Sequence, residues 1–234
     1  MLGGYSSLDG TVEFYGRVNS ILRSDFVVLD LGAGRGAWYY EDRCEYHRAL
    51  RNIRDKVVEY IGADIDPSVL DNPTTHRNVL IAGQHIPIAD ASADVIIADY
   101  VLEHVTDVIA FRDEIARILK PGGLFCARTP HALNYVVITA HIVKNARRTW
   151  LLRWAQPYRK TEDIFPTAYR FNKMADISRI FAGWENYSYV YTAEPQYHFG
   201  NKIAFSLFSL IHGFAPKSVT GNIFVFVRRP SHAG

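Results

Sequence analysis

The stretch VVLDLGAGRGAW, residues 27–38, decides the fold of this chain. It opens with a mostly apolar run of strand length, and Gly32, Gly34 and Gly36 follow. Glycine reaches positive φ and has no side chain, so such a loop turns sharply and can bring bare backbone against a ligand. The stretch therefore predicts a buried strand, a binding loop and the start of a helix.

Apolar runs of strand length recur along the rest of the chain. They are almost continuously hydrophobic, which is typical of parallel strands covered by helices on both faces. Segments of helical character lie between them, at 36–52, 107–119 and 173–181. This alternation predicts an α/β fold of the Rossmann-like, doubly wound kind. The strand candidates are 26–32, 57–65, 78–83, 93–100, 123–129, 184–194 and 222–229.

The composition is that of a single globular domain. Of the 234 residues, 48% are hydrophobic and 21% are charged, enough for a full apolar core. We expect one domain over 1–234, with its core at about 25–130 and 172–230 and cap insertions at about 131–172 and 196–220. The formal net charge of +2 is no signature of nucleic-acid binding.

The cysteines and the apolar segments indicate a compartment. Cys44 and Cys126 lie far apart, which excludes a disulfide scaffold and a cysteine-based zinc site and fits a reducing environment. Residues 1–10 lack the basic and apolar regions of a signal peptide. The longest apolar stretch, 203–215, is too short to span a bilayer. We therefore expect a cytoplasmic protein.

Two carboxylates accompany the glycine loop. Asp64 closes the second strand candidate, where a carboxylate can accept both hydroxyls of a ribose. The spacing Gly32-x-Gly34-x-x-Ala37 also satisfies a loose dinucleotide fingerprint, so a nicotinamide-dependent oxidoreductase is an alternative. Asp30, two residues before the first glycine, would repel a pyrophosphate and suits a cationic amino-acid ligand.

Four segments together resemble a known family. They are VVLDLGAGRGAW (27–38), YIGADIDPSVL (60–70), HIPIADASADVIIADYVLEHV (85–105) and FRDEIARILKPGGLFCARTP (111–130). In this order and spacing they are similar to class I S-adenosylmethionine-dependent methyltransferases, in the group related to ubiquinone and menaquinone methyltransferases. The resemblance covers about residues 25–130. It implies a seven-stranded, mostly parallel sheet with an antiparallel last strand and helices on both faces.

The resemblance also implies S-adenosylmethionine as cofactor and a set of residues around it. Asp64 would hold the ribose, and Ile65 would pack on the adenine. Ala82 stands where the family often has an acidic residue for the adenine amine, so Gln84, His85 or backbone would take that contact. The residues implied for the methionine side and the reaction mouth are Asp30, Gly32, Ala33, Gly34, Gly36, Asp99 and Tyr100.

Two histidines are candidates for a catalytic base. His104 belongs to the string LEHV (102–105), just after the fourth strand candidate, and a structural role for it is an equal alternative. His131 follows the fifth strand candidate, at the sheet edge where ligands of such folds gather. An oxygen acceptor would need such a base. No cluster at metal-ligand spacing stands in the sequence, so no metal is expected.

The acceptor side is marked by a basic segment. Residues 141–173 hold eight Lys or Arg against two acids, interleaved with aromatic residues. This pattern predicts either a solvated helix face or a surface for an anionic or lipid-linked acceptor in peripheral contact with a membrane. The helix expected at 199–214 would be a lid or a homodimer contact. No nucleic-acid recognition module is present.

These features together predict methyl transfer to a small-molecule or glycan/lipid-precursor acceptor, on oxygen. Two alternatives stay open. One is the nicotinamide-dependent oxidoreductase, which has no support outside the glycine loop. The other is a cofactor-binding partner protein without catalysis.

Overall fold

The computed structural model describes residues 2–83, 85–134, 167–192, 194, 210, 212 and 214–231. The strands are β1 (Val27–Leu31), β2 (Glu59–Asp64), β3 (Arg77–Leu80), β4 (Ala93–Asp99), β5 (Leu119–Pro130), β6 (Glu185–Asn186), β7 (Tyr189–Thr192) and β8 (Gly221–Arg228). The α-helices are α1 (Gly10–Ile21), α2 (Ala37–Glu41), α3 (Glu45–Arg51), α4 (Val108–Ile118), α7 (Met174–Ile180) and α9 (Lys217–Thr220). The 3-10 helices are η1 (Leu2–Gly4), η2 (Arg54–Lys56), η3 (Pro67–Asp71) and η4 (Leu102–His104).

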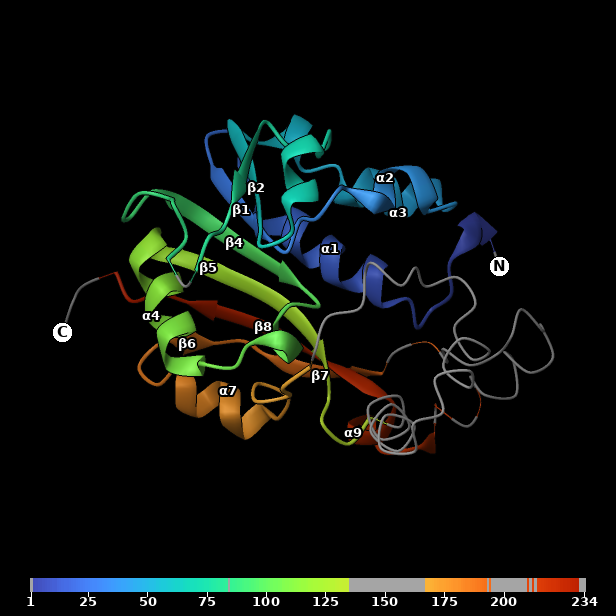
Figure 1. Cartoon of the computed structure of the whole chain (residues 1–234). Coiled ribbons are helices and arrows are strands. Elements are labelled where there is room, and N and C mark those ends of the chain that lie inside the picture. The colour runs from blue at the N-terminus through green and yellow to red at the C-terminus, as the bar shows by residue number, and fades with distance from the viewer. Residues whose placement is uncertain are drawn as a thin grey trace, which may run out of the picture.

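The strands form one mixed sheet in the order β3-β2-β1-β4-β5-β8-β6, with β7 also paired to β8. Strands β1 to β5 pair in parallel, and β8 runs antiparallel to β5 (Figure 1). The doubly wound sheet with an antiparallel last strand is thus confirmed. The described sheet has eight strands rather than seven. The segment expected as one strand at 184–194 forms two short ones in the same register, and between them the Ser188 hydroxyl, rather than the backbone carbonyl of Tyr187, accepts the Phe226 N–H.

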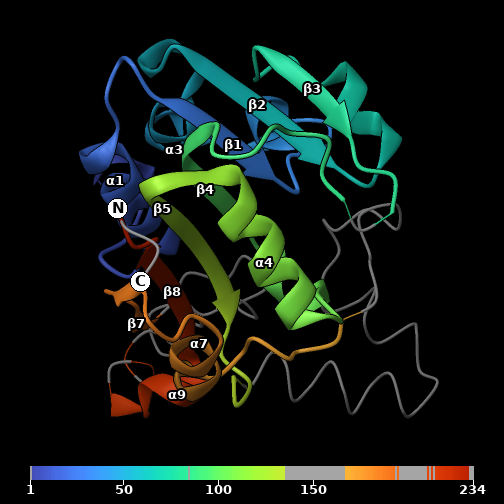
Figure 2. The ribbon, with the colours of Figure 1, turned by 90° about the vertical axis from the view of Figure 1, so that its left-hand side faces the viewer.

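Alternate strand residues enter two apolar clusters on opposite faces of the sheet. Leu29 of β1 belongs to the cluster packed under α4 and α7, and its neighbour Val28 belongs to the cluster packed under α1. Figure 1 shows α1, α2 and α3 on one side of the sheet, and Figure 2 shows α4 lying across the strands on the other. The two-faced core explains why the central strands read as continuous apolar runs.

The helix expected at 36–52 is interrupted. Asp42 ends α2 in an extended conformation, with φ −75° and ψ 120°. Its carboxylate then accepts the N–H of Cys44, the N-cap residue that precedes α3. Aspartate bonds readily to the backbone two residues ahead, and this local turn competes with helix continuation.

Of the other predicted elements, some agree with the structure and some lie outside the described residues. The expected helix at 107–119 is α4, capped by the Asp107 side chain on the Ala110 N–H. The predicted cap at 131–172 falls mostly on 135–166, outside the described residues, and so does most of the helix expected at 199–214. Among the residues that the structure describes, no helix is long and apolar enough to cross a membrane.

Candidate functional site

The glycine loop is shaped by three left-handed residues. Gly32, Gly34 and Gly36 have φ of 75°, 48° and 69°, a region that side-chain-bearing residues rarely adopt. The Gly32 and Ala33 N–H groups both donate to the carbonyl oxygen of Ala63 on β2, at 2.8 and 3.3 Å. The loop is therefore fastened to the neighbouring strand by its own backbone.

Asp64 adds a second connection between β2 and the loop. Its Oδ2 accepts the Gly34 N–H at 2.8 Å, and its Oδ1 accepts the Asp66 N–H at 2.9 Å. A carboxylate oxygen has two lone pairs, so each oxygen keeps one for a further donor. Ile65, the next residue, is 61% exposed. An acceptor pair for two hydroxyls thus lies beside an exposed apolar side chain.

Asp30 is buried below the loop. The Tyr60 hydroxyl donates to its Oδ2 at 2.7 Å. Burial raises the pKa of Asp30 to about 7, although the Tyr60 hydrogen bond opposes that rise. A nearby cation would lower this raised pKa, because it favours the charged form of the carboxylate.

Asp99, at the end of β4, lies between two arginines. Arg128 of β5 donates through Nε to Oδ1 and through Nη2 to Oδ2, the latter at 2.9 Å. Arg51 of α3 and the Tyr15 hydroxyl also donate to Oδ2, at 2.9 and 3.1 Å. Burial alone would raise the pKa of Asp99, but the two guanidiniums outweigh it and lower the pKa to about 2. The carboxylate is therefore ionised, and it accepts one hydrogen bond on Oδ1 and three on Oδ2.

Tyr100 follows Asp99 with a φ of 58°, unusual for an aromatic residue. Its hydroxyl accepts from Asn222 Nδ2 at 2.8 Å, and the Arg128 guanidinium lies 4.7 Å from its ring centroid. Asp99 and Arg128 follow Ile97 and Cys126 on the sheet face that α1 covers. The carboxyl end of this face is thus a polar layer above an apolar core.

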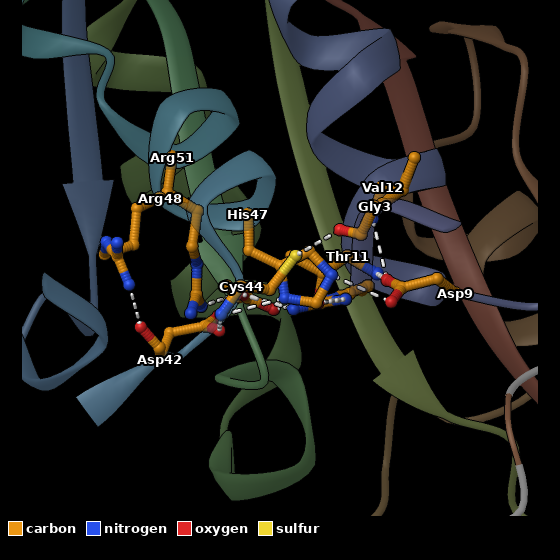
Figure 3. Close-up of polar contacts among 11 residues, drawn as sticks. Gly3, Asp9, Thr11, Val12, Asp42, Cys44, His47, Arg48 and Arg51 are labelled. Atoms are coloured by element: carbon orange, nitrogen blue, oxygen red, sulfur yellow. Dashed lines mark hydrogen bonds and ion pairs between the residues drawn. The ribbon is translucent and has the colours of Figure 1, made fainter. Parts of the chain in front are cut away.

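The helices above this polar layer are joined by His47 of α3 (Figure 3). Its Nδ1 lies 3.0 Å from Asp42 Oδ2, and its Nε2 lies 2.8 Å from Asp9 Oδ2. Asp9 Oδ1 caps α1 by accepting the Thr11 and Val12 N–H groups. The histidine therefore links the start of α1 to the connection between α2 and α3.

The two candidate bases are both placed near the carboxyl end of the sheet. His131 follows β5, and its Nδ1 accepts the Leu133 N–H at 3.1 Å. Burial lowers the pKa of His131. His104 ends η4, and its backbone N–H donates to the Val101 carbonyl at 2.9 Å. Because Nδ1 accepts this bond, the proton of the neutral ring is on Nε2. His131 can therefore abstract a proton only after Nδ1 releases the Leu133 N–H.

The adenine-side candidates are less fully placed. His85 is exposed, and its Nδ1 lies 3.2 Å from Glu114 Oε1 on α4. Gln84 lies outside the described residues. Ala82 and Gly83 are exposed, and a side chain on Gly83 would meet open space. The described residues 81–83 therefore present backbone rather than a carboxylate at this point.

Sequence reasoning missed several residues of the site. Arg51 and Arg128 surround Asp99, and Asn72 holds the glycine loop from below. Position 128 could have been suspected, because a charged residue closes an otherwise apolar strand candidate. Arg51 and Asn72 carry no such signal.

The site fits a cationic amino-acid nucleoside. Arg51 Nε is buried without a hydrogen-bond partner in the described part of the chain, and it can receive a carboxylate. Gly32 is exposed, and none of the hydrogen bonds among the described residues uses its carbonyl oxygen, which can accept from an ammonium. Asp64 offers the acceptors for a ribose.

Known proteins match both the sequence and the fold. The family model described as "Methyltransferase domain" matches residues 12–174. The "Probable S-adenosylmethionine-dependent methyltransferase" of Mycolicibacterium smegmatis is 40% identical over 116 residues, which cover 46% of this chain and 39% of the relative. The chain thus matches about two fifths of the length of that relative.

Solved structures show the same fold. A chain from a complex that contains the Haloferax volcanii Trm112 methyltransferase activator superposes with a TM-score of 0.59 at 17% identity, covering 96% of this chain and 91% of that one. The S-adenosylmethionine-dependent methyltransferase of Mesorhizobium loti gives 0.54 at 16% identity, covering 95% of this chain and 100% of that one.

The sheet order, the glycine loop and the acidic end of β2 define a class I S-adenosylmethionine-dependent methyltransferase fold. The family match spans most of the chain. The chain belongs to the methyltransferase domain family.

Proposed function

We propose that this chain transfers a methyl group from S-adenosylmethionine to an oxygen of a small-molecule or glycan/lipid-precursor acceptor. The observation that carries the proposal is the loop held between two groups of β2. The Ala63 carbonyl binds the Gly32 and Ala33 N–H groups, and the Asp64 carboxylate binds the Gly34 N–H. This arrangement places a bare backbone turn beside a carboxylate with free lone pairs.

Each part of the cofactor has a proposed set of contacts. Asp64 accepts the ribose hydroxyls, and Ile65 packs on the adenine. Gln84 and His85 lie on the adenine side, next to the backbone of Ala82. The methionine part lies against Asp30, Gly32, Ala33, Gly34 and Gly36, with Asp99 and Tyr100 beyond them.

S-adenosylmethionine supplies a methyl group already activated on a sulfonium. The chain's own residues have to orient the acceptor and exclude water. A hydroxyl acceptor also needs a group that takes its proton. We assign this role to His131, with His104 as the second candidate.

Ligand binding tests the cofactor assignment. Isothermal titration calorimetry should show binding of S-adenosylhomocysteine and none of NAD. Binding of NAD alone would favour the nicotinamide-dependent oxidoreductase. Binding of S-adenosylhomocysteine with no turnover of any acceptor would favour a partner protein without catalysis.

The base is tested separately. His131→Ala should leave the affinity for S-adenosylhomocysteine unchanged and strongly lower turnover with a hydroxyl acceptor. The matched variant His76→Ala removes a histidine whose Nδ1 accepts the Tyr60 N–H at 2.9 Å near the amino end of β2, away from the carboxyl end that holds Asp64, and should leave turnover unchanged. Unchanged turnover in His131→Ala would remove this residue from the proposed chemistry.

The acceptor proposal rests on the basic segment 141–173, most of which lies outside the described residues. An anionic or lipid-linked acceptor would be attracted by its eight Lys or Arg. Sedimentation with anionic vesicles at rising salt should show binding that salt weakens. No sedimentation at low salt would contradict membrane contact. Two free cysteines fit the proposed cytoplasmic location.

A further inference from the structure

A buried asparagine lies under the glycine loop. Asn72 follows η3 and is 3% exposed. Its Nδ2 donates to the carbonyl oxygens of Ala33 and Gly34, at 3.1 and 2.9 Å. Its Oδ1 accepts from the Thr74 N–H at 2.9 Å and from the Thr74 hydroxyl at 2.7 Å. All four hydrogen-bonding positions of the amide are used.

The orientation of this amide is unambiguous. The Thr74 backbone N–H can only donate, and the Ala33 and Gly34 carbonyls can only accept. A reversed amide would therefore oppose donor to donor and acceptor to acceptor. Asn72 consequently presents two N–H donors to the loop and no acceptor.

We propose that Asn72 is the positioning residue that sets the glycine loop in its cofactor-binding shape. This inference rests on the proposed function and extends it to a residue behind the site. Asn72 holds the carbonyl side of the loop, while Asp64 holds the Gly34 N–H. The peptide groups on either side of Gly34 are thus fixed from two directions.

Gly36 supports the same assignment. A Cβ built at position 36 would lie 2.5 Å from Asn72 Oδ1 and 3.0 Å from Thr74 Cγ2. The loop therefore packs directly on the asparagine amide. Glycine is needed at position 36 both for its φ of 69° and for the room that Asn72 and Thr74 occupy.

Asn72 itself is held in place by its backbone. Its N–H donates to the Val69 carbonyl at 3.0 Å, and its carbonyl oxygen accepts from Asn78 Nδ2 at 2.9 Å. Asn78 belongs to β3 and is in register with Gly62 of β2. The asparagine thus connects the glycine loop to β3 of the sheet by hydrogen bonds.

Asn72→Asp tests the role with little change of volume. The variant keeps an acceptor for Thr74 but sets a carboxylate oxygen against two carbonyl oxygens. We expect the Kd for S-adenosylhomocysteine, measured by calorimetry, to rise about tenfold, because the Ala33 and Gly34 carbonyls lose their shared donor and face a carboxylate oxygen instead. Hydrogen exchange should become faster specifically at residues 33–36. A general loss of stability, by contrast, would not speed exchange at these residues alone.

The matched control is Val69→Ala. Val69 is fully buried on η3, and its side chain makes no hydrogen bond to the loop. This variant should lower the Tm while leaving the Kd within about twofold, a change well below 1 kcal/mol. If Val69→Ala weakened binding as much as Asn72→Asp, the positioning role would be refuted.

Further outcomes separate this inference from the proposed function. No binding of S-adenosylhomocysteine by the wild-type chain would overturn the cofactor assignment, and unchanged exchange at 33–36 in Asn72→Asp would overturn the positioning role. If Asn72→Asp does not fold, Thr74→Val replaces it, since it removes only the hydroxyl donor to Asn72 Oδ1. A wild-type Kd in Thr74→Val, with wild-type exchange at 33–36, would then refute the inference.

Discussion

Asp99 and Arg128 stand opposite each other in register on the parallel strands β4 and β5, joined by two hydrogen bonds between carboxylate and guanidinium. Their side chains are only 10% and 5% exposed. Arg51 reaches the same carboxylate from α3. One buried anion therefore holds two cations at the carboxyl end of the sheet, and it joins α3 to two strands.

Removing the charge of Asp99 should be costly. Asp99→Asn leaves two guanidiniums buried without their anion, and we expect the free energy of unfolding to fall by roughly 3–5 kcal/mol. Urea denaturation measures the change. The control is Asp25→Asn, whose carboxylate pairs with Arg23 but is 68% exposed. That variant should cost less than about 1 kcal/mol, and equal losses in the two variants would contradict the buried network.

The combined contribution of Asp99 and Asp30 to stability should be greatest near pH 4. Asp99 has a folded pKa of about 2, below its unfolded value of 3.8, so its contribution is lost as the pH falls from 4 toward 2. Asp30 has a folded pKa of about 7, above 3.8, so the folded state keeps a proton that the unfolded state has released. Because only the unfolded state ionises Asp30 in this range, stability falls as the pH rises from 4 to 7.

Denaturation curves across pH can separate these two carboxyls. Asp30→Asn cannot ionise at this position, so the decline between pH 4 and 7 should become shallower, while the decline below pH 4 should remain. A wild-type profile in this variant would show that Asp30 does not cause the upper decline.

Cofactor binding should tighten as the pH rises through 7. Ionised Asp30 attracts the cationic sulfonium of S-adenosylmethionine, and its pKa of about 7 lies in the accessible range. S-adenosylhomocysteine lacks that sulfonium charge, so its Kd should change less between pH 6 and 8. Calorimetry at the two pH values compares the ligands. In Asp30→Asn, the Kd values of the two ligands should depend on pH to the same extent.

Gly36→Ala should weaken the cofactor site. The new methyl group would press against Asn72 and Thr74, and alanine disfavours the φ of 69°. We expect a lower Tm and a Kd for S-adenosylhomocysteine raised about tenfold, for a strain of roughly 1–2 kcal/mol.

Gly16→Ala is the matched control for this substitution. Gly16 lies inside α1, and a Cβ there would meet nothing within 4 Å. Alanine favours the helix by roughly 0.5–1 kcal/mol, so the Tm should rise and the Kd should stay unchanged. A fall in affinity in Gly16→Ala would show that the loss of affinity is not specific to position 36.

Much of the fold could be predicted because its signals are local. The apolar runs of the strands and the glycines of residues 32–36 are legible over a few residues, and the sheet agrees with them. The helix expected at 36–52 was wrong at Asp42, whose side chain bonds to the Cys44 N–H. Apolar periodicity does not register that competition between side chain and backbone.

The residues of the candidate site also fall into those that the sequence predicts and those that it does not. Asp30, Asp64 and the three glycines stand at strand ends, and the parallel topology brings strand ends to one edge. The partners of Asp99 come from 48 and 29 residues away, and Asn72 meets the loop from 38 residues away. No spacing rule predicts such pairs.

By itself, the sequence determined the alternation of strands and helices, the left-handed loop and the carboxylates beside it, because backbone conformation and apolar patterning depend on near neighbours. Only the tertiary structure decided which cations neutralise Asp99 and which amide holds the loop. Those contacts depend on how α3 and η3 pack on the sheet, and a buried polar group is satisfied by whatever partner that packing brings within reach.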